Sequence, residues 1–450
     1  MKLKRKIPYC FYFLILVFFF SSCKDKIDTS CHHSIDFEAH NIPVVSIAVA
    51  SSDFFDDEKG IYVEGEGNAS NWMGLKANYY SGKKVKAHFA YYSSDSFQIY
   101  QNIKINVSGG GSRSLPQKSF NIHSKKDTFF HHQFFNDLSI NFFSSLRLRN
   151  SGQDWSSTLM RDALMHSIAN GMNIDKQAYQ PVVVYLNGNY WGIYNLREKF
   201  NKSYLRSHHD IGDEKIASME QRTNVNYGDT VEYFNLLKYI ETNDLGQDEH
   251  YEFVQSQIHI DNFIDYFSAQ IYFANTDWPS NNIKYWKTDS PTSKWRWFLH
   301  DTDMGFGFAP FDVHPGGLDH NTLKYALNDS ISNLHNKPWS TFLFRNLLKN
   351  NQFRDLFLCT YKYNLETFFN PDRVIPIIDE IVYGIEAEMP NHINKWKDVE
   401  DERTIQSISQ WRSNVEELYD FAQNRPLIVK KHLLEHFELN EDEWEEQICF

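Results

Sequence analysis

The sequence predicts an α+β protein, with a β-rich N-terminal lobe over residues 42–200 and a mainly helical C-terminal lobe over residues 201–437. In the first lobe, Pro43–Val49 and Lys84–Tyr91 alternate in the way that strands with one buried face do. From about residue 201 onward, helical periodicity dominates. About 400 residues are enough to build a sizeable core divided between two lobes.

The remaining elements of the first lobe follow in order. Ile103–Val107 and Lys118–Ile122 predict two strands on either side of a glycine-rich turn. Ser156–Asn170 carries apolar residues on one helical face and predicts the single helix of this lobe. Two apolar runs then flank Asn187-Gly188, which is the strongest short signal for a β-hairpin.

The first 22 residues predict a signal peptide. Basic residues at Lys2 to Lys6 precede an almost wholly apolar run, Ile7–Phe20, which is shorter than the roughly 20 residues that a membrane span needs. Ser21-Ser22-Cys23 resembles the cleavage site of bacterial lipoproteins, so we expect lipid on Cys23. The alternative is an ordinary signal peptide followed by an incidental cysteine.

This start predicts an exported protein that is lipid-anchored to the cell envelope, at the outer membrane or the cell surface. Residues 23–41 are polar and predict a tether between the lipid and the folded domain. The tether contains His32, His33 and His40, and a metal site there is the less favoured alternative to a solvated linker.

The composition argues against nucleic acid as a partner. The net charge is −13, whereas nucleic-acid binding depends on basic contacts to phosphate. Beyond the leader and Cys23, the cysteines are Cys31, Cys359 and Cys449, an odd number at wide spacing that does not suggest a disulfide framework. No CxxC pair of the zinc-binding type is present.

A first candidate site is the glycine-rich turn Ser108–Arg113 with Lys118 on the following strand. Glycines allow backbone amides to approach phosphate oxygens, and a lysine supplies a compact positive charge beside them. Taken alone the pattern is weak, because glycine-rich hairpins with a nearby lysine are common.

A second candidate is Asp277–Asn282, directly after a predicted helix, Asp261–Asn275. Protein kinases use an aspartate that accepts the proton of the substrate hydroxyl and an asparagine five positions later that binds magnesium. Asp277 and Asn282 have this spacing. A helix-terminating loop would use the same residue types for structural reasons.

A third candidate is Asp301–Gly307, which follows the predicted strand Trp295–His300. In kinases a metal-binding aspartate follows a strand just downstream of the catalytic loop. The two carboxylates Asp301 and Asp303, with glycines beside them, suit magnesium, which prefers oxygen ligands. A structural turn is the alternative.

Together the three candidates occur in the order that kinases use, although the HRD, DFG and APE motifs are absent. The sequence resembles the CotH kinase family, the spore-coat protein H-like atypical protein kinases, over roughly residues 42–437. The motifs that carry the resemblance are Gly110–Phe120, Leu148–Asp154, Val184–Glu198, Asn275–Asn282 and Asp301–Gly307.

The resemblance implies an atypical protein-kinase-like two-lobe fold and transfer of phosphate from ATP, with Mg²⁺, to serine or threonine of exported proteins. It implies that Asp277 is the catalytic residue and that Asn282, Asp301 and Asp303 bind the metal. Arg113, Lys118 and Glu198 would contact the nucleotide, whereas Arg149 and Asp154 could simply buttress the helix. The alternative is a catalytically idle kinase-like surface module that binds a protein or a glycan.

Overall fold

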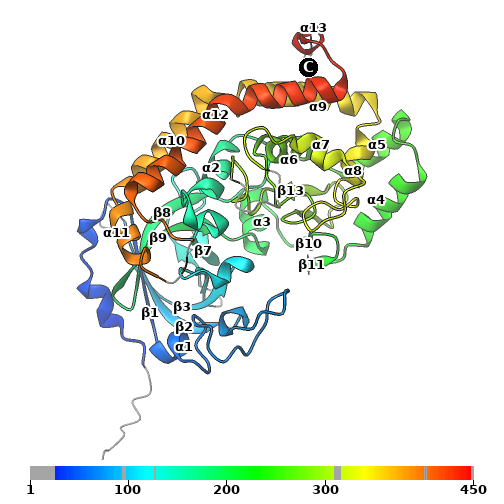
Figure 1. Ribbon diagram of the computed structural model, residues 1–450. Helices are drawn as coiled ribbons and strands as arrows, with labels where there is room; N and C mark the ends of the chain where they lie inside the picture. Colours follow the sequence, from blue (N-terminus) through cyan, green and yellow to red (C-terminus); the bar gives the residue numbers. More distant parts are fainter. Residues whose placement is uncertain are drawn as a thin grey trace, which may run out of the picture.

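The computed structural model describes residues 26–93, 98–125, 128–308, 316–399, 401 and 403–446 (Figure 1). The predicted signal peptide and Cys23 lie outside these residues. None of the described helices is both long and apolar enough to cross a membrane.

Seven strands close into a barrel in the N-terminal part of the chain, in the order β1-β2-β3-β4-β7-β9-β8. All neighbours are antiparallel except β1 and β8, whose parallel pairing closes the barrel. The strands are β1 (Val44–Val49), β2 (Val85–Tyr92), β3 (Gln98–Ser108), β4 (Ser119–Ser124), β7 (Ser145–Arg149), β8 (Tyr179–Leu186) and β9 (Asn189–Glu198).

The barrel interior is an apolar core in which successive strands place every second residue, such as Leu146 and Leu148 of β7. The predicted hairpin is confirmed: β8 and β9 are joined at Asn187 and Gly188, which both adopt positive φ, as a two-residue hairpin turn requires. Short elements around the barrel are α1 (Ser51–Phe55), α2 (Arg161–Ile168), and the strand pair β5 (Phe130–His131) and β6 (Phe142–Phe143).

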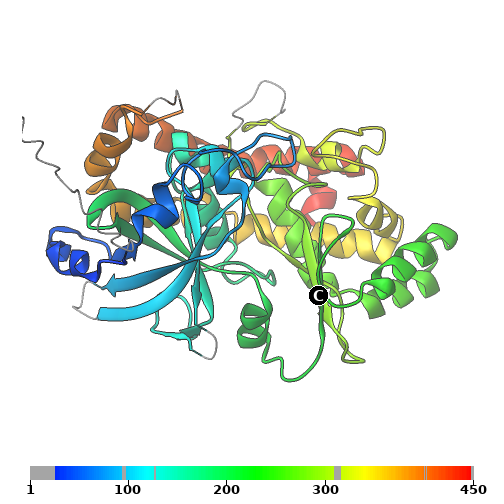
Figure 2. The same ribbon diagram turned by 90° about the horizontal axis from the view of Figure 1, so that it is seen from below.

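The C-terminal part contains a second, four-stranded sheet and most of the helices (Figure 2). Its strand order is β11-β10-β12-β13, all antiparallel. The strands are β10 (Ile216–Glu220), β11 (Asn224–Tyr227), β12 (Lys284–Thr288) and β13 (Arg296–Phe298). The helices are α3 (Lys202–His209), α4 (Val231–Thr242), α5 (Asp248–Gln257), α6 (Ile260–Tyr272), α7 (Thr322–Leu327), α8 (Phe342–Leu347), α9 (Asn351–Glu366), α10 (Pro371–Glu386), α11 (Met389–Trp396), α12 (Ile408–Phe437) and α13 (Glu441–Glu445).

Helices α10 to α12 connect the two parts, running along one side of the molecule in Figure 1. On α11, His392 Nδ1 accepts from the backbone N–H of Ile193 over 3.1 Å, which ties this helix to β9. On α12, the buried guanidinium of Arg425 donates to the backbone oxygens of Ile271 and Tyr272 at the end of α6. The long C-terminal helices therefore hold the barrel and the helical part together.

Part of the predicted tether lies against the barrel. Residues Thr29–Ser34 and Phe37–Ala39 form 3-10 turns, and the buried His32 bonds to Ser46 over 2.7 Å and to His88 over 3.0 Å. His40 pairs with Glu388 over 2.8 Å. The described part of this segment is thus folded onto β1, β2 and α11.

Three details differ from the fold expected from the sequence. The N-terminal part is a closed barrel rather than the simple β-lobe of a protein kinase, because β1 pairs with β8 across a long stretch of chain. The back part contains four strands where one was expected. Cys359 of α9 is disulfide-bonded, whereas Cys31 is a free thiol.

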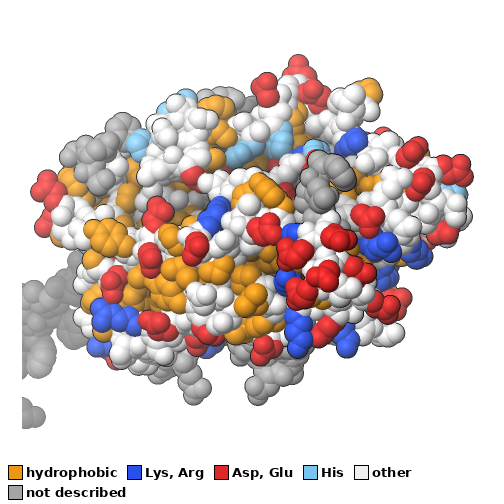
Figure 3. Space-filling view, turned by 90° about the horizontal axis from the view of Figure 1, so that it is seen from above, with side chains coloured by type: hydrophobic (Ala, Val, Ile, Leu, Met, Phe, Trp, Pro, Cys, Tyr) orange, Lys and Arg blue, Asp and Glu red, His pale blue; other side chains and the backbone are white. Residues whose placement is uncertain are grey.

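Figure 3 shows the face formed by the C-terminal helices. Acidic side chains are scattered over it, as the net charge of −13 leads one to expect, and Lys and Arg are interspersed among them. A band of hydrophobic side chains crosses its middle.

Candidate active site

The loops Asp277–Asn282 and Asp301–Asp303 meet because of the second sheet. The first loop leads into β12, the second follows β13, and the antiparallel register pairs Lys284 with Phe298. The start of β12 and the end of β13 therefore lie side by side, and the loops share one edge of the sheet. The Nδ2 of Asn282 donates to Asp277 Oδ2 over 2.7 Å and to the backbone oxygen of Asp301 over 3.2 Å.

Both loops hold a residue in an uncommon backbone conformation. Asn282 has φ 52° and Asp301 has φ 51°, in the left-handed region where Asn and Asp are the best tolerated residues apart from glycine. Such conformations persist only where the surrounding structure enforces them, and they are frequent at functional sites. The two residues whose side chains matter most here are thus also fixed by their backbones.

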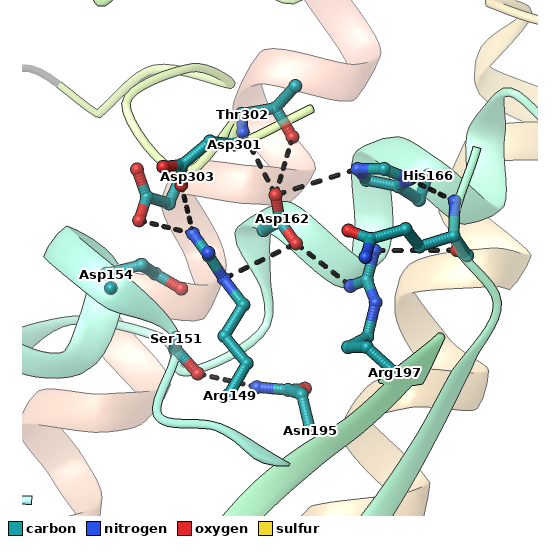
Figure 4. Close-up of polar contacts among 12 residues, drawn as sticks. Arg149, Ser151, Asp154, Asp162, His166, Asn195, Arg197, Asp301, Thr302 and Asp303 are labelled. Carbon is teal, nitrogen blue, oxygen red and sulfur yellow. Dashed lines mark hydrogen bonds and ion pairs between the residues drawn. The ribbon is translucent and has the colours of Figure 1, made fainter. Parts of the chain in front are cut away.

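Arg149, the last residue of β7, links the barrel to the second loop (Figure 4). Its guanidinium forms ion pairs with Asp301 and, over 2.7 Å, with Asp303 Oδ2. The same Asp303 oxygen accepts from the backbone N–H of Gln153 over 2.9 Å. Gly152, at φ 63°, leaves the room for this carboxylate, because a Cβ there would overlap it.

Asp162 on α2 completes a buried charge network (Figure 4). It pairs with Arg197 of β9 over 3.0 Å and with Arg149 over 3.6 Å, and it accepts from the backbone N–H of Thr302 over 2.9 Å. Burial alone would raise the pKa of Asp162, but Arg149 and Arg197 outweigh it and hold the pKa well below its usual range. Arg149 on β7 and Asp162 on the following helix α2 thus form an ion pair between a strand and a helix.

The pKa of Asp303 shifts in the opposite direction from that of Asp162. Burial, and then the neighbouring charge of Asp301, raise the pKa of Asp303 well above its usual range. The two carboxylates are held close together, and the Arg149 guanidinium bridges them as a cation. A second cation at this place would relieve the remaining repulsion.

The donor set fits magnesium. The side chain of Asp301 is 34% exposed, and both bonds of Asn282 use its amide nitrogen, which leaves the amide oxygen for a cation. Within the described ranges, no three His, Cys, Asp or Glu side chains converge into a ready-made metal cage. Magnesium does not need one, since it usually takes one or two carboxylates and completes its shell with water and substrate phosphates.

Asp277 is held by three side chains. Asn281 donates to its Oδ1 over 2.9 Å, Asn282 donates to its Oδ2 over 2.7 Å, and His335 Nδ1 lies 2.6 Å from Oδ1. The backbone N–H of Ser280 donates to the His335 oxygen over 2.8 Å, so the loop that carries His335 is tied to the Asp277 loop. Asp277 is therefore fixed in orientation while 16% of its side chain stays exposed.

The nucleotide residues expected from the sequence lie apart from this cluster or at its margin. Lys118 is buried, and its Nζ donates to the backbone oxygens of Arg113 and Leu115 over 2.8 and 2.9 Å, above the ring of Tyr79. Arg113 donates to the backbone oxygen of Gly109 over 2.6 Å. Both side chains thus brace the glycine turn. Glu198 is buried and bonds to His208 over 2.7 Å.

The sequence interpretation missed Asp162, Arg197 and His335, because nothing local marks them. The sequence suggests Arg149 as a buttress for the helix, whereas the structure places it between the two aspartates. Asp154 does serve the helix: its buried carboxylate accepts from the backbone N–H groups of Met160 and Arg161, where α2 begins.

The site is that of a kinase-like protein. It combines the acidic pair Asp301 and Asp303 after a strand, the fixed loop from Asp277 to Asn282, and an ion pair between a strand and a helix. The family model described as CotH kinase protein matches residues 105–429. The chain belongs to the CotH kinase family. A search of curated proteins gave no match.

Proposed function

We propose that this protein transfers the terminal phosphate of ATP to serine or threonine residues of exported proteins, in a magnesium-dependent reaction. The observation that carries the proposal is the bond between Asn282 and Asp277, next to the carboxylates of Asp301 and Asp303. Phosphoryl transfer needs little covalent help from the protein, so positioning and charge stabilisation are the main contributions.

Each residue has a distinct role in this proposal. Asp277, which three neighbours hold in place, orients the acceptor hydroxyl and takes its proton. Asn282, Asp301 and Asp303 hold Mg²⁺, which neutralises negative charge on the donor phosphates when bound. Arg149 keeps the two aspartates in place from the barrel side. Lys118 and Arg113 shape the glycine turn that faces the donor.

We further propose that the predicted signal peptide, with lipid on Cys23, directs this activity outside the cytoplasm to the cell envelope. Residues 29–40 lie on the barrel, on the side of His88 and Glu388, so the anchor would reach the folded part there. Metabolic labelling with a radioactive fatty acid tests this part, since Cys23→Ala should remove the label. Label retained in the variant would contradict the anchor.

The direct test of activity combines binding and transfer. Magnesium with a non-hydrolysable ATP analogue should raise the melting temperature, by mass action, and Asp301→Ala should remove the shift. Transfer of the labelled γ-phosphate to a serine- and threonine-rich protein should be lost in Asp277→Asn, while binding remains. Binding without any transfer by the wild type would favour the second candidate, a catalytically idle surface module. The partial exposure of Asp277 argues for activity.

A further inference from the structure

The outer face of the barrel next to the active site carries a group of cations. Leu146 and Leu148 of β7 point into the barrel core, so Arg147 between them points outward. The register pairs Arg147 with Asn121 of β4, and Arg147 Nε donates to Asn121 Oδ1 over 3.2 Å. The guanidinium is partly buried, and Arg149, two residues further along the same face of β7, pairs with Asp301.

Lys284 approaches the same space from the second sheet. Its Nζ lies 3.0 Å from His300 Nε2 and 3.2 Å from Glu220. The Lys284 ammonium can only donate, and His300 Nε2 is placed to accept one of its hydrogens. Lys284 follows Asn282 by two residues and His300 precedes Asp301 directly, so this cation borders the predicted metal ligands.

A third cation, Lys199, follows β9 and is half-buried. Burial, and then Arg147, Lys84 and Lys284, lower the pKa of Lys199 to about 8. Burial and Arg149 likewise lower the pKa of Arg147 to about 10. The β7–β9 register pairs Arg147 with Arg197, so Lys199, two residues beyond Arg197, continues the same face, and it lines a small pocket together with Ser145 of β7.

The three cations differ in their ion pairs. Among the described carboxylates, Glu220 pairs with Lys284, whereas none forms an ion pair with Arg147 or Lys199. Partly buried cations without a paired carboxylate are costly, so these side chains suit an anionic ligand.

We propose that Arg147, Lys199 and Lys284 form the site that binds the polyphosphate chain of the phosphate donor. The inference deepens the proposed function and rests on it, and it differs from the sequence expectation by assigning the phosphates to Arg147 rather than to Lys118. Both hydrogen bonds of the Lys118 ammonium go to backbone oxygens of the glycine turn. Arg147, in contrast, has guanidinium nitrogens left to form paired bonds with phosphate oxygens.

The test is binding of inorganic tripolyphosphate, ATP and adenosine to the mature protein, measured by isothermal titration calorimetry. Arg147→Gln and Lys199→Gln should each weaken tripolyphosphate and ATP binding by about tenfold or more, because a charge-assisted bond is lost. Arg354→Gln is the matched control, since Arg354 lies on α9 and is 43% exposed. Urea unfolding of each variant checks that the fold is intact.

Unchanged tripolyphosphate affinity in both folded variants would overturn the assignment. Tighter binding of ATP than of tripolyphosphate identifies a nucleotide as the donor, and equal binding identifies a simple polyphosphate; either result supports the cation site. Asp277→Asn separates the anion site from the kinase activity, because this variant should lose phosphate transfer while binding remains. Loss of polyphosphate binding in Arg147→Gln, with no transfer by the wild type, would preserve the anion site and reject the kinase activity.

Discussion

The amide nitrogen of Asn282 donates to a carboxylate oxygen of Asp277 over 2.7 Å. This contact joins the group proposed to orient the acceptor to a group proposed to hold the metal. Because Asn282 also donates to the backbone oxygen of Asp301, one side chain joins the two loops. This bond adds to the β12–β13 pairing and to the hydrogen bonds from Thr276 to the Met304 backbone oxygen.

Replacing Asn282 by aspartate should break the bond to Asp277. Asn282→Asp keeps the left-handed backbone accessible but replaces a donor by a second carboxylate beside Asp277. We expect phosphate transfer to fall by roughly a hundredfold, since positioning groups contribute effects of this order. Steady-state kinetics with labelled ATP measures the change.

Asn424→Asp is the matched control for this experiment. Asn424 is exposed on α12 and donates to Asp420 over 2.8 Å, so the substitution creates the same kind of carboxylate pair far from the site. Transfer should remain at the wild-type rate. A wild-type rate in Asn282→Asp would show that the Asp277 loop does not depend on this bond.

Gly152 should tolerate no side chain. At φ 63°, Gly152→Ala forces an alanine into the left-handed region, which lowers stability. The new Cβ would also overlap the Asp303 carboxylate. Gly74→Ala separates these effects, because Gly74 has φ 80° and no atom within 4 Å of a new Cβ. We expect both variants to lose about 1 kcal/mol from the backbone. Only Gly152→Ala should lose more and also lose the thermal shift with magnesium and ATP. An equal loss of stability in the two variants would contradict the predicted overlap.

The sequence predicts individual strands and helices better than it predicts the strand pairing that closes the barrel. The Asn187-Gly188 hairpin and the helix at 261–275 depend on local signals, and both are present. The barrel is closed by the pairing of Val44 with Val183, a contact between distant residues that no local pattern encodes. Similarly, β10 and β12 are only five residues long, too short to show a clear period.

The same contrast holds for the candidate site. Asp277, Asn282, Asp301 and Asp303 were selected from kinase-like order, and the structure brings them together, while their roles stay predictions. The cations were missed, although Leu146-Arg147-Leu148-Arg149 alternates as a strand with a charged outer face does. Lys118 was favoured for its place after the glycines, but burial turns it toward the backbone.

Asp162 should make the protein sensitive to acid. Its folded pKa is depressed, so its stabilising contribution is complete above the ordinary aspartate pKa and is lost as the pH falls through the folded value. Asp162→Asn should destabilise the protein by about 3–5 kcal/mol at pH 7, because the buried Arg197 guanidinium loses its carboxylate partner and Arg149 loses one of its three. The stability of the wild type should then fall toward that of the variant below pH 4. Urea unfolding from pH 7 to pH 3 measures both, and a constant difference would contradict the assignment.

Lys118 should act on stability more than on donor binding. Lys118→Met removes two hydrogen bonds to backbone oxygens, at a cost of about 2–3 kcal/mol, and Lys431→Met, at a side chain that is 74% exposed, should cost almost nothing. Burial lowers the pKa of Lys118 to about 8, so the unfolded chain binds the extra proton between pH 8 and the ordinary lysine value. The wild type should therefore gain stability relative to Lys118→Met as the pH rises through this window. If Lys118→Met instead keeps its stability and loses tripolyphosphate binding, the phosphate contact belongs to Lys118 and the role given to Arg147 is wrong.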